Sequence, residues 1–480
     1  MKESSSVGAL AASLRRDFER YQPGEKLPSS RALVERYGVG PVTVSRAVAQ
    51  LAAEGVLVTR PGAGAFRAER SAPARRGGDT SWQEVALSAE TATGPGGSVP
   101  RSVEDAGVLA TLAAPPPGTI SFQGGYLHPS LRPDRAMAAA LAGAARRPGV
   151  WEQPPIGGIE ELRGWFAREI TGPTGHLDAS HVLITAGGQS ALTTALRALA
   201  PPGGSVLVES PTYAGLLAVA RACGMRPVPV PVDADGLRTE LLEGAFRATG
   251  ARVLVCQPLF HNPTGAVLAP ERRARVLRIA REAGAFVVED DFARRLAHAD
   301  AGSQPPPLAA DDEHGTVVHV CSLTKATSPS LRVGALAARG PVLRRLRAIQ
   351  VVDSFFVPRP LQEATLELVG SPAWRRHLGA LAAGLAERRT AMTAALLREL
   401  PGLEQPVSRR GGYHLWLPLP EGADERGVVA EALRSGVAVA PGHVYFPAEP
   451  PGPHLRLSFA ATAGAHEIDE GVRLLAGVLR

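Results

Sequence analysis

The apolar residues near the start of the chain recur at helical spacing. Leu10, Leu14 and Phe18 lie four residues apart and predict an amphipathic helix over residues 8–21. After a Gln-Pro-Gly turn, a serine is placed to cap a second, short helix, and Gly38 is placed to end it. The pattern therefore predicts two successive helices at this end of the chain.

A third helix and an alternating segment follow. The helix is predicted over about residues 42–54, after a Val-Gly-Pro turn, and residues 55–67 indicate a β-hairpin. Three helices followed by a hairpin are typical of a winged helix-turn-helix domain, whose third helix enters the major groove of DNA. A small helical domain with a solvated basic face is the alternative. We assign residues 1–70 to this domain.

Residues 71–118 have a different composition, rich in serine, threonine, glycine and proline. We predict a linker here, with one short helix near residues 103–112. A coil of about 50 residues reaches on the order of 40 Å, so the domains on either side can adopt several relative placements.

From Ile120 onward, apolar runs alternate with helical segments. The runs that read as buried strands are residues 181–185, 205–209, 252–256, 285–289 and 316–320. This order predicts an α/β fold with a mainly parallel sheet and helices on both faces. Residues from about 370 predict a smaller α+β part that ends in a strand over residues 454–459.

The charged residues are unevenly distributed along the chain. The 480 residues carry a formal net charge of +6. Residues 1–76 hold 13 basic and 7 acidic residues, and the remainder holds 39 of each. All of the excess positive charge therefore lies in the first sixth of the chain, as expected of a nucleic-acid-binding head on a neutral body.

Neither targeting nor metal binding is indicated by the sequence. The chain has no run of eighteen apolar residues, and its first residues lack the apolar core of a signal peptide. The cysteines, Cys223, Cys256 and Cys321, lie in separate apolar segments without metal-ligand spacing. They indicate buried, reduced thiols in a cytosolic protein.

One lysine stands out in the second half of the chain. Among 52 basic residues, only Lys2, Lys26 and Lys325 are lysines. Arginine stays charged, whereas a buried amine can lose its proton and attack a carbonyl, so arginine cannot replace a nucleophilic lysine. Lys325 is therefore a candidate Schiff-base lysine. The alternative is a surface lysine left over from the arginine bias.

Polar residues that suit an anion and a planar ring follow the predicted strands. Ligands of open α/β sheets bind beyond the carboxyl ends of the strands. A glycine turn over residues 185–192 opens a helix whose free N–H groups could hold a phosphate, and Ser322 and Arg332 could bind the same anion. Tyr213 offers an aromatic face, and Asn262 offers an amide donor to a phenolate oxygen.

Carboxylates complete this set. Glu289-Asp-Asp ends another strand, and one of its side chains could keep a pyridinium nitrogen protonated. Each feature alone is weak, because glycine turns, Asn-Pro loops and paired aspartates are common. In this order, together with Lys325, they describe a site for pyridoxal 5′-phosphate.

The segment LPSSRALVERYGVGPVTVSRAVAQLAAEGVLVTRPGAGAF resembles the GntR family of regulators. The resemblance implies contacts with a double-stranded DNA operator. It places Thr43, Ser45 and Arg46 toward bases or phosphates, and it places Arg31 and the wing residue Arg60 on the DNA backbone.

Residues 119–480 resemble the pyridoxal 5′-phosphate-dependent aminotransferases of fold type I, and the whole chain resembles MocR-type transcriptional regulators. The resemblance makes Lys325 the internal-aldimine lysine and Asp290 the partner of the pyridine nitrogen. Asn262 would bond the ring oxygen, and Tyr213 would stack on the ring. The residues that would hold the phosphate are Gly188, Gln189, Ser322 and Arg332. We call residues 1–70 the head and residues 119–480 the body.

Three further positions bear on the ligand. Arg456 matches the arginine that grips a substrate carboxylate, and a solvent-facing strand arginine is the alternative. Phe292 stands where the family usually has a tyrosine, so one hydroxyl contact to the cofactor is missing. Trp151 stands where a family tyrosine reaches the phosphate of the neighbouring subunit, and a tryptophan offers only an indole N–H. We therefore expect little or no turnover.

The leading hypothesis is a cytoplasmic, homodimeric DNA-binding regulator that contains pyridoxal 5′-phosphate. A small amine or amino-acid effector would form an external aldimine, shift the conformation of the body and alter the grip of the head on DNA. The second hypothesis is an active aminotransferase that carries a DNA-binding appendage. The third is a DNA-binding protein whose body has lost the cofactor and serves only dimerisation.

Overall fold

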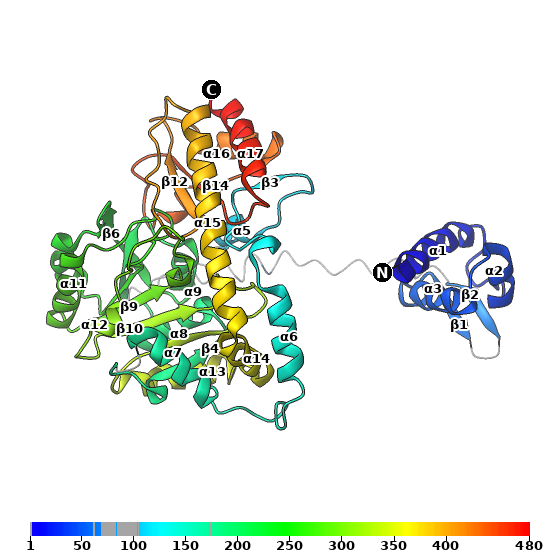
Figure 1. The fold of residues 1–480 in the computed structure, drawn as a ribbon, viewed down its shortest axis with the longest axis horizontal. Helices are drawn as coiled ribbons and strands as arrows, with labels where there is room; N and C mark the ends of the chain where they lie inside the picture. The colour runs from blue at the N-terminus through cyan, green and yellow to red at the C-terminus, as the bar shows by residue number, and fades with distance from the viewer. Residues whose placement is uncertain (1, 61–62, 69–82, 84–102, 104, 173–174) are drawn as a thin grey trace. The chain divides into compact units, whose positions relative to one another are not determined.

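The structure is a computed structural model of the 480-residue chain. It describes all residues except 1, 61–62, 69–82, 84–102, 104 and 173–174. The chain divides into two compact units, one up to residue 90 and one from residue 91 onward (Figure 1). Each unit is described separately below.

The first unit has the predicted winged helix-turn-helix order. Its elements are α1 (Lys2–Phe18), α2 (Ser30–Tyr37), α3 (Pro41–Ala53), β1 (Leu57–Arg60) and β2 (Gly64–Arg67). The strands pair antiparallel with Arg60 opposite Gly64, and the tip between them lies outside the described residues. The first helix was predicted over residues 8–21 but ends at Phe18, because the next N–H groups bond three residues back and form a tight turn.

The apolar stripe of α1 forms the core of the head. Leu10, Leu14 and Phe18 are buried together with residues of α2, α3 and β1. The caps of α2 are those predicted: the Ser29 hydroxyl accepts from the N–H of Ala32, and Gly38 ends the helix in the left-handed conformation at φ +62°. Local sequence signals therefore fix the ends of this helix.

The second unit is built on an eight-stranded sheet in the order β4-β11-β10-β9-β8-β5-β6-β7. The strands are β4 (Val182–Thr185), β5 (Ser205–Ser210), β6 (Arg226–Asp233), β7 (Gly236–Leu237), β8 (Val253–Cys256), β9 (Phe286–Asp291), β10 (Val317–Ser322) and β11 (Gly334–Ala337). Neighbouring strands from β10 to β6 run parallel, which confirms the predicted α/β fold with a mainly parallel sheet.

The sheet contains one strand that places the predicted lysine loop. β11 was not predicted, and it runs antiparallel to both β10 and β4. Because β11 returns directly beside β10, Ser322 pairs with Gly334, and Thr185 of β4 pairs with the same glycine. The connection that carries Lys325 therefore begins and ends at the carboxyl edge of the parallel strands.

A second unpredicted strand, β6, reads Arg-Pro-Val-Pro-Val-Pro-Val-Asp. Proline lacks an N–H and is normally excluded from paired strands. Here the prolines alternate with Val228, Val230 and Val232, and successive N–H groups in a strand point to opposite sides. All the valine N–H groups can therefore face the parallel partner β5, while the prolines face the other side.

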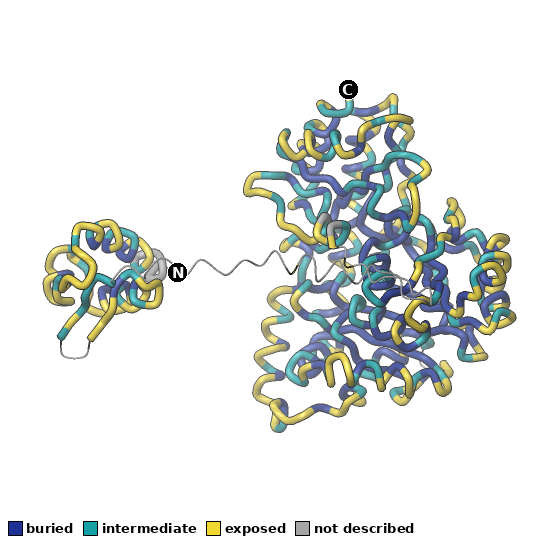
Figure 2. The backbone as a smooth tube through the Cα atoms, turned by 180° about the vertical axis from the view of Figure 1, so that it is seen from behind, coloured by how far each residue is buried: buried dark blue, intermediate teal, exposed yellow. Residues whose placement is uncertain are grey.

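Both faces of the sheet are buried under helices, as predicted. Neighbouring residues such as Val287 and Val288 belong to different apolar clusters, one on each face. Residues of α8 (Gly188–Leu199), α9 (Ala214–Ala222) and α13 (Val342–Ser354) pack in one cluster. Residues of α7 (Glu160–Thr171), α10 (Leu242–Thr249), α11 (Pro270–Glu282) and α12 (Leu308–Asp311) pack in the other. Figure 2 shows buried residues concentrated inside this unit.

The C-terminal part is a smaller α+β layer. A three-stranded sheet joins β12 (His414–Pro418), β15 (His454–Ser458) and β14 (Ala440–Pro441), and β13 (Val437–Ala438) pairs with β3 (Ile120–Ser121). The helices are α15 (Pro372–Glu399), α16 (Glu425–Arg434) and α17 (Ala465–Leu479). The prediction that this part ends in the strand over residues 454–459 is wrong, because α17 follows that strand and packs against the long helix α15 (Figure 1).

Three helices connect these regions: α5 (Ala106–Leu112), α6 (Asp134–Ala144) and α14 (Arg359–Gly370). Most of the predicted linker lies outside the described residues, but the short helix expected near 103–112 is present as α5 and contacts α9. Cys256 and Cys321 are buried, whereas Cys223 is only partly buried. Among the described helices, none is long and apolar enough to cross a membrane.

Candidate functional site

A cavity opens at the carboxyl edge of the large sheet, where β4, β5, β8, β9 and β10 end. Its lining residues are Tyr126, Gly188, Gln189, Leu192, Tyr213, Gln257, Asn262, Asp290, Phe292, Ser322, Thr324, Lys325, Arg332 and Tyr413. The structure thus brings together all eight residues that the sequence assigned to the cofactor, although they span 145 positions. Their individual roles toward the cofactor stay predictions.

One end of the cavity suits an anion. By helix geometry the first N–H groups of α8, beginning with Gly188, have no partner within the helix, and the dipole favours negative charge there. Gly187 precedes them at φ +85°, and a Cβ atom on it would lie 3.1 Å from the guanidinium carbon of Arg332. Arg332 itself has φ +49° and donates to the Ala186 carbonyl at 2.8 Å. The protein holds this arginine against the helix start at the cost of a strained backbone.

Lys325 lies half-buried in the wall of the same cavity. Its Nζ donates to the carbonyl of Gly125 at 2.7 Å and sits 4.2 Å from the ring centre of Tyr126. Exclusion of solvent lowers the pKa of the Lys325 ammonium to about 8. At pH 7.5 about a quarter of the molecules therefore carry a neutral amine, which is the form that attacks a carbonyl.

Asp290 lies at the end of β9, with its side chain in the cavity. Burial raises the pKa of its carboxyl to about 6, and the Gln257 side-chain amide, which donates to Oδ2 at 2.6 Å, opposes that shift. The carboxylate is thus ionised at neutral pH, and its burial destabilises the folded state of the cofactor-free protein. A positively charged ring nitrogen would offset this cost.

The cost gives a prediction for Asp290→Asn. A rise in pKa from 3.8 to about 6 destabilises the folded state by about 3 kcal/mol at pH 7.5. The folded protein binds this proton more tightly than the unfolded chain, so the penalty shrinks as pH falls, to about half at pH 5. Asp290→Asn should therefore raise the free energy of unfolding of cofactor-free protein by about 3 kcal/mol at pH 7.5 and by less at pH 5. Urea denaturation at both pH values measures this. A loss of stability at pH 7.5 would contradict it.

Tyr213 and Asn262 also line the cavity. The Tyr213 hydroxyl donates to Oε1 of Gln189 at 3.1 Å, and burial raises its pKa, so the phenol keeps its proton. Asn262 is buried in the loop between β8 and α11. Both side chains line the cavity, and their contacts with a bound ring stay predictions.

Arg456 lies beside the cavity but does not line it. The residue is 2% exposed, so the alternative of a solvent-facing strand arginine is wrong. One guanidinium nitrogen is 3.4 Å from Oδ1 of Asn262, another donates to the Gln123 carbonyl at 2.6 Å, and Nε has no hydrogen-bond partner among the described residues. A buried guanidinium without a carboxylate on its fork is suited to a carboxylate ligand.

The two departures from the family pattern lie in different surroundings. Phe292 lines the cavity and packs edge to face against Tyr413, with ring centres 6.3 Å apart. Trp151 is 79% exposed on the surface of this single chain. Its predicted place near a second subunit stays a prediction.

Four lining residues with polar atoms in their side chains had no role in the sequence prediction: Tyr126, Gln257, Thr324 and Tyr413. Gln257 directly follows β8, so the rule that ligands bind beyond the carboxyl ends of strands could have found it. Thr324 lies inside the lysine loop. Tyr126 and Tyr413 come from segments outside the large sheet, and no local signal marks them.

The charges and polar groups of these residues suit pyridoxal 5′-phosphate. A helix start and Arg332 offer donors to the phosphate, and buried Asp290 offers a carboxylate to the ring nitrogen. The hydroxyl of Thr324 is buried without a hydrogen-bond partner among the described residues, which leaves one more polar group for a ligand. Lys325 offers the amine.

The head presents the side chains that were predicted to contact DNA. Ser45 and Arg46 are exposed on α3, and Thr43 is half-buried there. Arg31 is exposed on α2, and Arg60 is exposed on the wing strand β1, where its guanidinium lies 4.7 Å from the Phe66 ring. Their contacts with DNA stay predictions.

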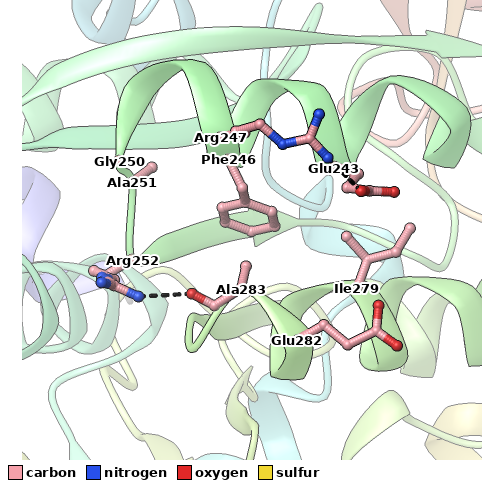
Figure 3. Close-up of a pocket in the computed structure, with 9 residues that line it drawn as sticks. All are labelled: Glu243, Phe246, Arg247, Gly250, Ala251, Arg252, Ile279, Glu282 and Ala283. Atoms are coloured by element: carbon pink, nitrogen blue, oxygen red, sulfur yellow. Dashed lines mark hydrogen bonds and ion pairs between the residues drawn. The ribbon is translucent and has the colours of Figure 1, made fainter.

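A second pocket lies at the opposite edge of the sheet. It opens between α10 and α11, beside Arg252 at the amino end of β8, and Figure 3 shows Phe246 within it. Arg252 donates to the Ala283 carbonyl at 2.6 Å and Arg247 pairs with Glu243 at 2.5 Å. Both arginines therefore have partners within the protein, and we place the candidate site in the first cavity.

Comparison with known proteins gives matches to both units. Residues 123–475 match the family "Aminotransferase class I and II", and residues 8–66 match "Bacterial regulatory proteins, gntR family". The 2-aminoadipate transaminase of Thermus thermophilus is 32% identical, over 76% of this chain and 91% of that protein. The HTH-type transcriptional regulator TauR of Rhodobacter capsulatus is 29% identical, over 96% of this chain and 93% of that protein.

A solved structure matches the body. The α-aminoadipate aminotransferase LysN from Thermus thermophilus, complexed with N-(5′-phosphopyridoxyl)-L-leucine, superposes with a TM-score of 0.74 at 29% identity, over 83% of this chain and 98% of that one. The fold is therefore that of a fold type I aminotransferase. Through its body the chain belongs to the class I and II aminotransferase family, and with its GntR-family head it is a transcription regulator of the MocR type.

Proposed function

We propose that this chain binds pyridoxal 5′-phosphate in its body, senses an amine or amino-acid effector there, and changes the DNA affinity of its head in response. The observation that carries the proposal is the cavity itself, where Lys325, Asp290 and the start of α8 converge. The head and the similarity to TauR over 96% of the chain support a regulator rather than a metabolic enzyme.

Each group in the cavity has a separate task. Pyridoxal 5′-phosphate, when bound, supplies an aldehyde that condenses reversibly with an amine. The α8 N–H groups, Ser322 and Arg332 hold its phosphate. Asp290 keeps the ring nitrogen protonated, and Asn262 donates to the ring oxygen. Lys325 supplies the resident amine, because its lowered pKa gives it a neutral fraction at physiological pH.

Arg456 selects effectors that carry a carboxylate. It lies next to Asn262, and its second fork nitrogen bonds only a backbone carbonyl, that of Gln123. Its Nε has no hydrogen-bond partner among the described residues, so a carboxylate that binds across Nε and a neighbouring N–H gains a bidentate, charge-assisted contact.

Binding energy then serves regulation rather than turnover. An effector that prefers one conformation of the body shifts the DNA affinity by its differential affinity for the two conformations, typically about 1–3 kcal/mol. Phe292 places no hydroxyl where family members have one, so transamination should be slow or absent. We further propose that the protein acts as a cytoplasmic homodimer.

The test compares a carboxylated amine with the same amine lacking its carboxylate. In wild-type protein the amino acid should change the visible spectrum of the bound cofactor and the DNA affinity at the same concentrations. Arg456→Ala should weaken the response to the amino acid by about tenfold or more, because one bidentate contact to a buried charge is lost, and should leave the response to the plain amine unchanged. Titrations monitored by absorbance and by DNA fluorescence anisotropy measure both.

Two results would contradict the proposal. Sustained turnover of an amino acid with a keto acid, with a DNA affinity that neither compound changes, would indicate an active aminotransferase that carries a DNA-binding head. If Arg456→Ala weakens the responses to the amino acid and to the plain amine equally, Arg456 does not bind the carboxylate. Arg456→Lys is the matched variant, since it keeps the charge without the planar fork.

A further inference from the structure

Gln257 is a buried polar residue between the strands that carry the site. It is the first residue after β8, which lies between β5 and β9 in the sheet. It is 4% exposed and lines the cavity. Its neighbours on the two sides are Glu209 near the end of β5 and Asp290 near the end of β9.

Three hydrogen bonds hold this one residue. Its backbone N–H donates to Oε2 of Glu209 at 2.7 Å. Its side-chain Nε2 donates to Oδ2 of Asp290 at 2.6 Å, and its Oε1 accepts from the backbone N–H of Asn262 at 3.0 Å. A single amide group therefore bridges Asp290 and Asn262, two of the residues predicted to contact the cofactor ring.

The bridge fixes which end of the amide faces the carboxyl. A backbone N–H can only donate, so Asn262 requires the oxygen end of Gln257. The NH₂ end must then face Asp290, whose Oδ2 must accept. A protonated Oδ2 would direct its own hydrogen at a donor, so this geometry favours the ionised carboxylate.

We propose that Gln257 is a positioning residue that keeps Asp290 ionised and sets its distance from Asn262, so that both side chains meet one cofactor ring. The inference rests on the proposed function, because it requires a ring with a basic nitrogen in the cavity. Gln257 itself acts through its two neighbours and needs no contact with the ring.

The charges around Asp290 show why such a donor is needed. Burial raises the pKa of this carboxyl, and the Asp291 and Glu209 charges also raise it. Gln257 and Lys325 act in the opposite direction, and Gln257 has the larger effect of the two. A lysine amine that is bound to the cofactor aldehyde would carry a charge only when its nitrogen is protonated, whereas the Gln257 amide donates in either case. It is thus the persistent local support for the charge on Asp290.

The test uses two forms of the cofactor on the full-length protein. Pyridoxal 5′-phosphate has a basic ring nitrogen, and its 1-deaza analogue has a carbon there and cannot use Asp290. Binding is followed by quenching of tryptophan fluorescence, so no catalytic activity is required. Wild-type protein should bind the natural cofactor more tightly. Gln257→Met should weaken natural cofactor binding about ten- to a hundredfold, the range for a hydrogen bond to a buried charge, and change analogue binding by about twofold at most.

The matched control is Gln362→Met. Gln362 is another buried glutamine that bridges backbone groups, accepting from Ile159 N at 2.8 Å and donating to the Val357 carbonyl at 2.7 Å, outside the cavity. It should keep the full preference for the natural cofactor. If Gln257→Met does not fold, Gln257→Leu, which also lacks the donor and the acceptor, takes its place and should lose the preference in the same way.

The outcomes separate the two proposals. Equal weakening of both cofactor forms by the Gln257 variant, or an unchanged preference, would overturn the role of Gln257 and leave the proposed function standing. Wild-type protein that binds neither form would overturn the proposed function and this inference with it.

Discussion

Lys325→Arg should lose every covalent link between protein and cofactor. Arginine keeps the positive charge, but its guanidinium does not deprotonate in proteins and cannot attack the aldehyde. Wild-type protein reduced with borohydride should carry the cofactor on the peptide that contains Lys325, as mass spectrometry can show. The variant should carry none, while it keeps noncovalent phosphate binding through α8 and Arg332.

The other lysines provide the control for this result. Lys26 is exposed in the head, and Lys26→Arg should leave labelling of Lys325 unchanged. Label on Lys2 or Lys26 in fully loaded wild-type protein would contradict the assignment. The pH dependence gives an independent check: because the pKa of Lys325 is about 8, the rate of covalent loading should rise with pH and level off above this value.

Removing single arginines from the head should have the second large effect, on DNA binding. Arg31, Arg46 and Arg60 are the basic side chains predicted to face DNA. Three phosphate contacts for each head give a slope of about −3 in log affinity against log salt, so raising salt from about 50 to 200 mM should weaken binding by about 40-fold per head. If Arg46 reads a base, Arg46→Ala should cost about 1–3 kcal/mol at the preferred operator and much less on random DNA.

Fluorescence anisotropy at several salt concentrations, with operator and random DNA, measures both effects. If Arg46 instead contacts a phosphate, Arg46→Ala should weaken binding to operator and random DNA equally and make the salt slope shallower by about one. Arg247→Ala in the body is the control, since this exposed arginine pairs with Glu243. A body fragment starting at residue 119 that bound the operator as tightly as the full chain would refute the role of the head.

The cost of Asp290 links stability to ligand binding. Burial holds its carboxylate at a raised pKa, so Asp290→Asn is expected to stabilise the cofactor-free protein while it removes the partner of the ring nitrogen. Opposite effects of one substitution on stability and on binding are expected where a site is built for a ligand rather than for folding.

The sequence alone determined the features that depend on neighbouring residues. Helical spacing, the Ser29 cap and Gly38 gave the helices of the head, and apolar runs gave β4, β5, β8, β9 and β10. Because parallel strands end at one edge of a sheet, the residues that follow these runs were predicted to converge, and the structure places them in one cavity.

Tertiary structure decided the contacts that no local pattern encodes. The antiparallel return of β11 brings Arg332 to the helix start of α8, and the two lie more than 130 positions apart. Arg456 reaches the Gln123 carbonyl across 333 positions, and Gln257 joins Asp290 to Asn262. Periodicity reports only which face of an element is apolar. Which buried polar groups meet depends on how those faces pack, because each buried donor must find its acceptor wherever the fold places one.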